Sequence, residues 1–239
     1  MPSDTLLAAM LQEAVLALVA LVAVRFAVPD ALKRCTQSVQ QRNTVRFAGI
    51  TLLLTGLVGG AITILTWYFA NSGNGAGFVS AVLPSAVDLM ENLLLLLGIC
   101  LLTGLYEESF MRVLGIEAFE RALDTKRAIL ASAALFALLH VGAPDVSAGQ
   151  LVLLQTALKF GQALLFGVIL GALYVRTRRL WPCAFIHAGF DVLYMTPNVL
   201  LTGTMPETYA SGAMGDTVLL AVSVLMLSGI VLKIRKEIA

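Results

Sequence analysis

Hydrophobic residues along the chain gather into seven long runs separated by polar connections. An α-helix needs about 20 mostly apolar residues to cross a bilayer, and several of these runs approach or exceed that length. The runs predict membrane helices at residues 6–28, 47–70, 88–106, 128–141, 151–175, 180–201 and 217–234. The alternating apolar pattern of a transmembrane barrel is missing. We therefore expect an all-α fold, a polytopic bundle of about seven spans.

Between the third and fourth runs, apolar residues alternate with charges in EESFMRVLGIEAFERALDTKR. This pattern predicts that the third helix continues and then becomes an amphipathic helix at the membrane interface. Two pairs of glycines four residues apart, Gly56/Gly60 and Gly167/Gly171, indicate close helix contacts.

The composition agrees with a single integral membrane domain over residues 1–239. Hydrophobic residues make up 59% of the chain and charged residues only 13%, whereas soluble domains carry about 25% charged residues. The net charge of +1 and the lack of a long basic run give no indication of a nucleic-acid partner. Cys35, Cys100 and Cys183 are scattered without CxxC spacing, so we expect small apolar residues rather than disulfides.

The charges in the connections predict an orientation in the cell membrane. Lys and Arg occur in alternate connections only, at Arg25, Lys33, Arg34, Arg42, Arg46, Lys126, Arg127, Arg176, Arg178, Arg179, Lys233, Arg235 and Lys236. Basic connections remain in the cytoplasm. The N-terminus is therefore expected outside and the C-terminus inside.

Ionisable residues inside apolar spans are costly and by default mark function. The candidates are Glu13, Asp88, Glu91, Glu107, Glu108, Arg112, His140, Lys159, His187 and Asp191. We expect Asp88 and Glu91 to be solvated near the outer end of their span. Both histidines of the chain lie within predicted spans, and each has a partner four residues away, Phe136 for His140 and Asp191 for His187.

Glu107 and Glu108 have different expected roles. Glu108 and Arg112 are spaced i, i+4 with the acid first, the favoured order for a helical ion pair. Glu107 points about 100° away from Glu108 and is left to act as a general base on water, with a histidine sharing that water. A second histidine could face an oxyanion. Alternatively, Glu107 and the two histidines could hold a zinc ion. The sequence alone does not choose between these arrangements.

Gln155, Lys159 and Gln162 share one face of the fifth run. This face is either a polar seam between helices or the lining of a watery cavity. Motifs of other intramembrane proteases, HExxH, GxGD and GxSG, are absent.

Three patches together resemble the CPBP family, also called the Abi or CAAX-protease family, whose best-known branch is the Rce1-type CAAX prenyl endopeptidases. The family motifs EExxxR, FxxxH and HxxxN/D read here as EESFMR, FALLH and HAGFD. The resemblance covers about residues 90–195. It implies an intramembrane endopeptidase in which Glu107 and His140 activate water, His187 and Asp191 stabilise the oxyanion, and Glu108 and Arg112 support Glu107.

Two departures qualify that implication. Arg112 is followed by Val113 where many members have glycine, and Asp191 stands where eukaryotic members have asparagine. An ionised carboxylate cannot donate a hydrogen bond, so Asp191 is expected to orient His187 instead. We expect no obligatory metal cofactor, although zinc or another divalent ion would suit the residue types. The expected partners are the lipid bilayer and a peptide or membrane-protein substrate.

Depth is a test of this interpretation. If Arg112 marks the cytoplasmic face, Glu107 and His187 lie roughly 8–10 Å deep and His140 roughly 18 Å deep, at ~1.5 Å per residue. The three can meet only if the fourth span starts later or runs obliquely. The alternatives to a protease are a non-proteolytic immunity or regulatory protein that keeps the polar site, and a proton-coupled carrier.

Overall fold

The computed structural model describes residues 2–30, 33, 42–72, 86–141, 147, 149–202, 205 and 210–238; Arg34 and Cys35 lie outside them. The helices are α1 (Pro2–Ala27), α3 (Arg42–Ser72), α4 (Ala86–Glu108), η1 (Ser109–Ile116), α5 (Glu117–Phe119), α6 (Thr125–Val141), α7 (Gln150–Thr177), α8 (Leu180–Thr202) and α9 (Met214–Ile238). Each predicted run overlaps one long helix, and the described residues contain no strand. The all-α prediction is confirmed.

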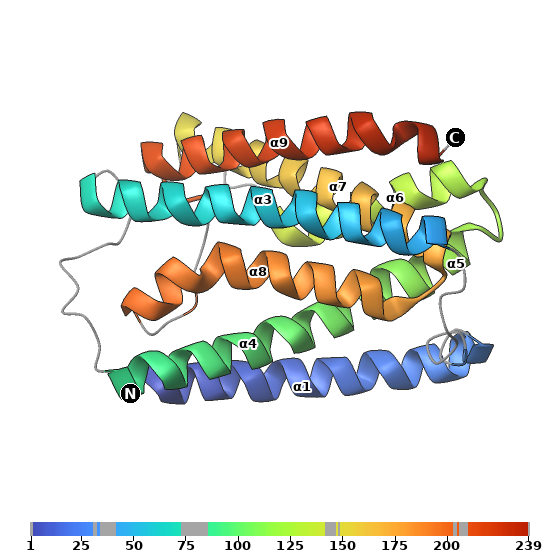
Figure 1. The fold of residues 1–239 in the computed structure, drawn as a ribbon, viewed down its shortest axis with the longest axis horizontal. Coiled ribbons are helices and arrows are strands. Elements are labelled where there is room, and N and C mark those ends of the chain that lie inside the picture. The colour runs from blue at the N-terminus through green and yellow to red at the C-terminus, as the bar shows by residue number, and fades with distance from the viewer. Residues whose placement is uncertain are drawn as a thin grey trace.

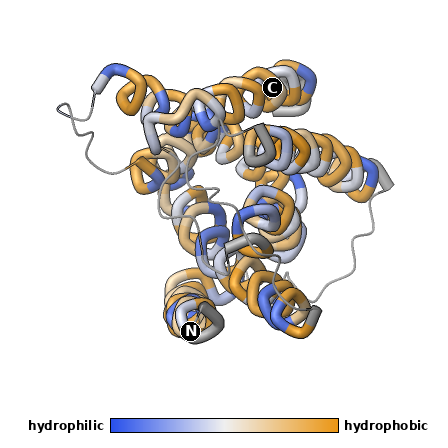
Figure 2. Tube along the Cα trace, turned by 90° about the vertical axis from the view of Figure 1, so that its left-hand side faces the viewer, coloured by the Kyte–Doolittle hydropathy of each residue, from blue (hydrophilic) through white to orange (hydrophobic). Residues whose placement is uncertain are grey.

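The long helices lie side by side along one direction (Figure 1). α8 packs extensively against α4 and α3, α6 packs against α7, and α4 also packs against α1. Hydrophobic residues run along every tube of the bundle in Figure 2. Because apolar side chains such as Leu18, Phe26 and Ile64 are exposed on the outside, the bundle is suited to a lipid environment.

Five helical segments are long and apolar enough to cross a membrane: Thr5–Ala27, Thr44–Phe69, Val87–Phe119, Gln150–Thr177 and Met214–Ile234. The chain is therefore a multi-pass membrane protein. The two other long helices are α6 and α8. α6 has 17 residues, which span only about 26 Å, and α8 carries the polar residues His187 and Asp191 within it. A total of seven crossings stays a prediction.

Small residues allow the closest helix contacts. A Cβ placed on Gly104 of α4 would lie 2.6 Å from the Ala184 carbonyl oxygen of α8. The predicted contacts at Gly167 and Gly171 are present, since both face α6. In the stretch Gly56–Gly60, the predicted close contact is made by Gly59, which approaches Leu193 of α8, whereas Gly56 and Gly60 face open space. Helical spacing could not tell which face of that helix meets the protein.

The third predicted run does continue past Glu108, as the π-helix η1. Its side chains at Arg112, Val113 and Ile116 are buried, so the polar and apolar residues of this segment both pack into the protein. A π-turn leaves backbone carbonyls without their usual helical donors. Here the Ser132 hydroxyl of α6 donates to the Met111 carbonyl and fixes η1 to that helix.

The bundle end that contains η1 and α5 is closed by polar contacts. Arg178, directly after α7, forms a two-pronged ion pair with Glu120, with its Nη1 2.6 Å and its Nη2 2.8 Å from the carboxylate oxygens. The Tyr174 hydroxyl donates to Glu117 at 2.6 Å. These contacts join the end of α7 to the turn that leads into α6.

Candidate active site

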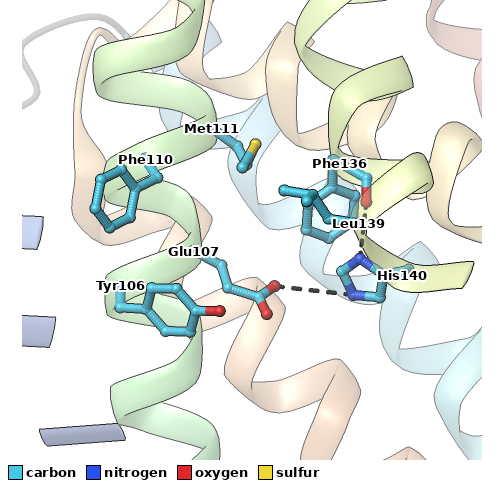
Figure 3. A pocket seen from close by; sticks show the side chains of 7 residues that line it. All are labelled: Tyr106, Glu107, Phe110, Met111, Phe136, Leu139 and His140. Carbon is cyan, nitrogen blue, oxygen red and sulfur yellow. Dashed lines mark hydrogen bonds and ion pairs between the residues drawn. The ribbon is translucent and has the colours of Figure 1, made fainter. Parts of the chain in front are cut away.

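Three helices and η1 bring the six predicted site residues into one cluster. Glu107 and Glu108 end α4, Arg112 lies on η1, His140 ends α6, and His187 and Asp191 lie on α8. Since α4 packs against α8, the Glu pair of α4 faces the histidine of α8. In Figure 3 the Glu107 carboxylate points toward the His140 ring across a gap between α4 and α6.

Glu107 occupies the centre of this cluster. Its Oε2 lies 3.5 Å from His187 Nε2 and 3.9 Å from His140 Nε2. Among the described residues, only Oε2 of Glu107 and Oε2 of Glu13 are buried side-chain oxygens without a hydrogen-bond partner. A buried carboxylate oxygen without a donor is costly, and water between Glu107 and His140 would relieve that cost.

Glu108 points to the other side of α4, as its offset from Glu107 predicts. Arg112 Nε lies 2.8 Å from one Glu108 oxygen and Nη2 3.3 Å from the other, so the predicted ion pair is present and bidentate. Both side chains are fully buried. Glu108 Oε1 also lies 2.9 Å from His187 Nδ1. The ion pair therefore positions His187 directly, a contact that the sequence did not predict.

The hydrogen bonds of the two histidines define which nitrogen faces Glu107. A carboxylate only accepts, so His187 Nδ1 donates to Glu108, and Nε2 lies 3.4 Å from Asp191 Oδ2. His140 Nδ1 donates to the Phe136 carbonyl at 2.9 Å, which leaves its Nε2 as the acceptor. Both rings therefore present Nε2 toward the Glu107 carboxylate.

Phe136 holds these polar groups in place. Its ring centre lies 4.2 Å from that of His140, 5.9 Å from that of His187 and 4.9 Å from the Arg112 guanidinium. Phe166 of α7 meets His187 edge-on at 5.3 Å. The first position of the FxxxH motif is thus a packing centre, whereas sequence spacing had related it to His140 alone.

A cavity of about 460 Å³ adjoins Glu107 and His140. Its other lining residues are apolar or aromatic: Tyr106, Phe110, Met111, Phe136 and Leu139 (Figure 3). A second, much smaller recess of about 30 Å³ lies on the far side of Phe136 and His140, against α7 and α8. The large cavity can hold an apolar ligand segment, while the recess fits one or two oxygen-sized groups.

The depth expected for Glu107 rested on a wrong premise, because Arg112 does not mark the end of its helix. Arg112 is fully buried, and the apolar helical segment runs on to Phe119. Glu107 lies twelve residues from that end. Counting residues along single helices therefore did not predict relative depth, whereas the distances show that both histidines meet Glu107.

The polar face of α7 was predicted to be either a seam between helices or the lining of a cavity. Its residues divide between these two roles along the helix. Gln155 forms a seam with α9, donating to the Ala213 carbonyl and Thr217 Oγ1 and accepting from the Gly212 amide. Lys159 and Gln162 line the small recess. The Lys159 ammonium donates to Gln162 Oε1 at 3.0 Å.

The cluster contains residue types that could bind a metal ion. Glu107 and the two histidines are ligand types that zinc accepts, but in the described part of the chain no group of three or more such side chains is spaced to hold a metal ion. Oε2 of Glu107 lies 3.9 Å from His140 Nε2. His187 Nδ1 contacts Glu108, which is also the second contact that a metal-bound histidine makes. The prediction that no metal is obligatory stays a prediction.

Of three comparisons with known proteins, one gives a match, and it covers the clustered residues. Neither the comparison with curated proteins nor that with solved structures gives a match. Residues 89–193 match the family described as type II CAAX prenyl endopeptidase Rce1-like. This segment extends from α4 into α8 and contains all six clustered residues. Over residues 89–193, the chain is similar to the Rce1-like CAAX prenyl endopeptidases of the CPBP family, which is a family of peptidases.

Proposed function

We propose that the protein is an intramembrane endopeptidase in which Glu107 activates the hydrolytic water. The observation that supports this best is the buried Glu107 Oε2 without a hydrogen-bond donor, 3.9 Å from His140 Nε2 in the wall of the large cavity. A water about 2.8 Å from both atoms would bind them at an angle of about 90°. Because the water donates one hydrogen to each group, its two lone pairs are directed away from both.

The protons of the hydrolysis can be transferred by residues of this chain alone. Glu107 takes a proton from the water, and the water oxygen forms a bond to the carbonyl carbon of the substrate. The carbonyl oxygen becomes an oxyanion. When the carbon–nitrogen bond breaks, the proton on Glu107 passes to the leaving nitrogen. His140 Nε2 orients the water by accepting its second hydrogen bond.

In this proposal His187 faces the carbonyl oxygen, and its neighbours position it. A proton on Nε2 lies between the Glu107 and Asp191 carboxylates, at 3.5 and 3.4 Å. Asp191 only accepts, so it orients the ring. Glu108 and Arg112 hold Nδ1 on the other side. The support pair thus acts on His187 rather than on Glu107 as expected from the resemblance.

The large cavity favours a substrate with apolar side chains next to the bond that is cut. Tyr106, Phe110, Met111 and Leu139 would contact such side chains. Cavities of this size commonly bury most of a small ligand. We propose that the substrate is an extended peptide or a membrane-protein segment.

We propose further that the site opens to the cytoplasm. In Figure 1 the ends of α1, α7 and α9 that carry Arg25, Arg176 and Lys233 lie at one end of the bundle. The Arg176 guanidinium also stacks over Phe47 of α3 at 4.8 Å. Clustered basic residues favour the cytoplasmic side. The side chains of Arg42, Arg235 and Lys236 lie outside the described residues. Reporter fusions at the C-terminus test the orientation.

The central experiment compares wild type, Glu107→Gln, Glu107→Ala and His140→Ala on a peptide panel in detergent. Glu91→Gln is the matched control, since Glu91 is exposed on the same helix as Glu107. We expect cleavage in wild type and Glu91→Gln, loss of at least about 100-fold in the Glu107 and His140 variants, and unchanged thermal stability of Glu107→Gln.

Full cleavage by both Glu107 variants would contradict the proposal. Cellular activity that survives Glu107→Ala would favour the regulatory protein instead. Each assay is run with and without a chelator: a chelator-sensitive rate restored by added zinc would establish a metal requirement, and an insensitive rate supports the metal-independent water activation given above.

A further inference from the structure

Lys159 is a charged residue of the site for which the proposed mechanism has no role. It lies on α7, in the middle of an apolar segment that is long enough to span the membrane. Its side chain is partly buried. An ammonium group in such a segment is costly, and a purely structural role would be served by a neutral residue.

The surroundings of Lys159 place its charge next to the proposed reaction. The small recess of about 30 Å³ is lined by Lys159, His140, Gln162, His187 and Asp191, together with apolar residues. His140 and Phe136 border both this recess and the large cavity. A carbonyl carbon attacked between Glu107 and His140 can therefore direct its oxygen into the recess, which has room for such an atom.

The hydrogen-bond chemistry of the recess favours Lys159 as the stabilising group. Asp191 carries no proton to donate when ionised, and its charge repels an oxyanion. Gln162 already accepts from Lys159 Nζ at 3.0 Å through Oε1 and donates through Nε2 to Ser223 of α9 at 2.8 Å. The Lys159 ammonium also lies 5.3 Å from the ring centre of Tyr194. These contacts fix the ammonium while its positive charge acts through the recess.

We propose, on the basis of the function proposed above, that Lys159 is a further catalytic residue whose ammonium stabilises the oxyanion together with His187. A fixed cation next to a developing negative charge stabilises the transition state more than the neutral substrate. Asp191 then has two tasks that suit a carboxylate, orienting His187 and balancing the charge of Lys159.

The test separates kcat from KM. We expect Lys159→Met to lower kcat about 10²- to 10³-fold with KM changed less than about threefold, and Lys159→Arg to retain part of the activity because the positive charge remains. The midpoint of the acidic limb of the pH–rate profile should stay in place. A midpoint that moves with the loss of activity would show that Lys159 acts through Glu107, and would overturn the proposal.

Binding measurements keep the test valid if cleavage by Lys159→Met is too slow to follow. An anionic phosphinate analogue of a cleaved peptide should bind Lys159→Met at least tenfold more weakly than wild type, whereas the parent peptide should bind both equally in a Glu107→Gln background. Equal phosphinate binding, or weaker binding of both ligands, would overturn the proposal.

Failure of the role proposed for Lys159 can be distinguished from failure of the proposed function. If Glu107→Gln still cleaves peptides, the water-activation mechanism fails. If Glu107→Gln is inactive but Lys159→Met cleaves at the wild-type rate, only the role of Lys159 fails.

Discussion

Gly104→Ala tests whether the contact between α4 and α8 sets the geometry of the site. Gly104 lies one helical turn before Glu107 and Glu108 on α4. An added methyl carbon would lie 2.6 Å from the backbone oxygen of Ala184, and ordinary contact begins at 3.4 Å. Because the obstacle is backbone, no side chain can rotate away. The two helices must therefore separate by about 0.8 Å or shift along each other.

The consequence for the site follows from the distances. Glu108 Oε1 and His187 Nδ1 are 2.9 Å apart across this same helix pair. A separation of about 0.8 Å would stretch the pair beyond the limit of a hydrogen bond. Misplacement of catalytic groups by about 1 Å can cost about 100-fold in rate. Overpacking costs about 1–3 kcal/mol, partly offset by the ~1 kcal/mol gain in helix propensity from Gly to Ala.

The assay is peptide cleavage together with thermal unfolding in detergent. The matched control is Gly60→Ala, which gains the same methyl group on a helix but meets no atom within 4 Å. We expect Gly104→Ala to lose about 100-fold in cleavage rate with a modest fall in the unfolding temperature, and Gly60→Ala to keep the wild-type rate. A Gly104→Ala protein that cleaves like wild type would refute the reasoning, since the helices would then tolerate the methyl without moving the site.

Two further predictions concern stability. Ser132→Ala removes the donor to the Met111 carbonyl and the acceptor 3.3 Å from Arg112 Nη1. It should cost about 1–3 kcal/mol, while Ser228→Ala, which removes only a bond within α9, should cost less in the same denaturation assay. Hydrogen bonds from Arg178 hold the pKa of the Glu120 carboxyl below its ordinary 4.5. The folded-state pKa is depressed, so the pair stabilises the protein above pH 4.5 and this contribution is lost as the pH falls through the lower folded-state pKa. Glu120→Gln should remove about 1 kcal/mol or less at pH 7, and a difference from wild type that persists unchanged at pH 3 would contradict this account.

Local patterns predicted the elements well because burial in a bilayer imposes long apolar helices. The fifth run, predicted at 151–175, is Gln150–Thr177 in the structure. The ion pair of Glu108 and Arg112 was also predictable, since both residues lie on one helix at a fixed spacing. Spacing within one helix did not reveal the π-helical turn at Ser109–Ile116. That turn depends on donors from another helix, such as Ser132.

From the sequence alone it was possible to predict a helical membrane protein, the residues available for chemistry, and the different directions of Glu107 and Glu108. Helix periodicity and the cost of buried charge are local properties, so one chain segment suffices to see them. The packing of the helices was needed to see that Glu108 holds His187, that Phe136 contacts the polar groups, and that Lys159 borders the recess. Those relations depend on the distances between helices, and here the close approach at Gly104 and the burial of Arg112 bring the groups together.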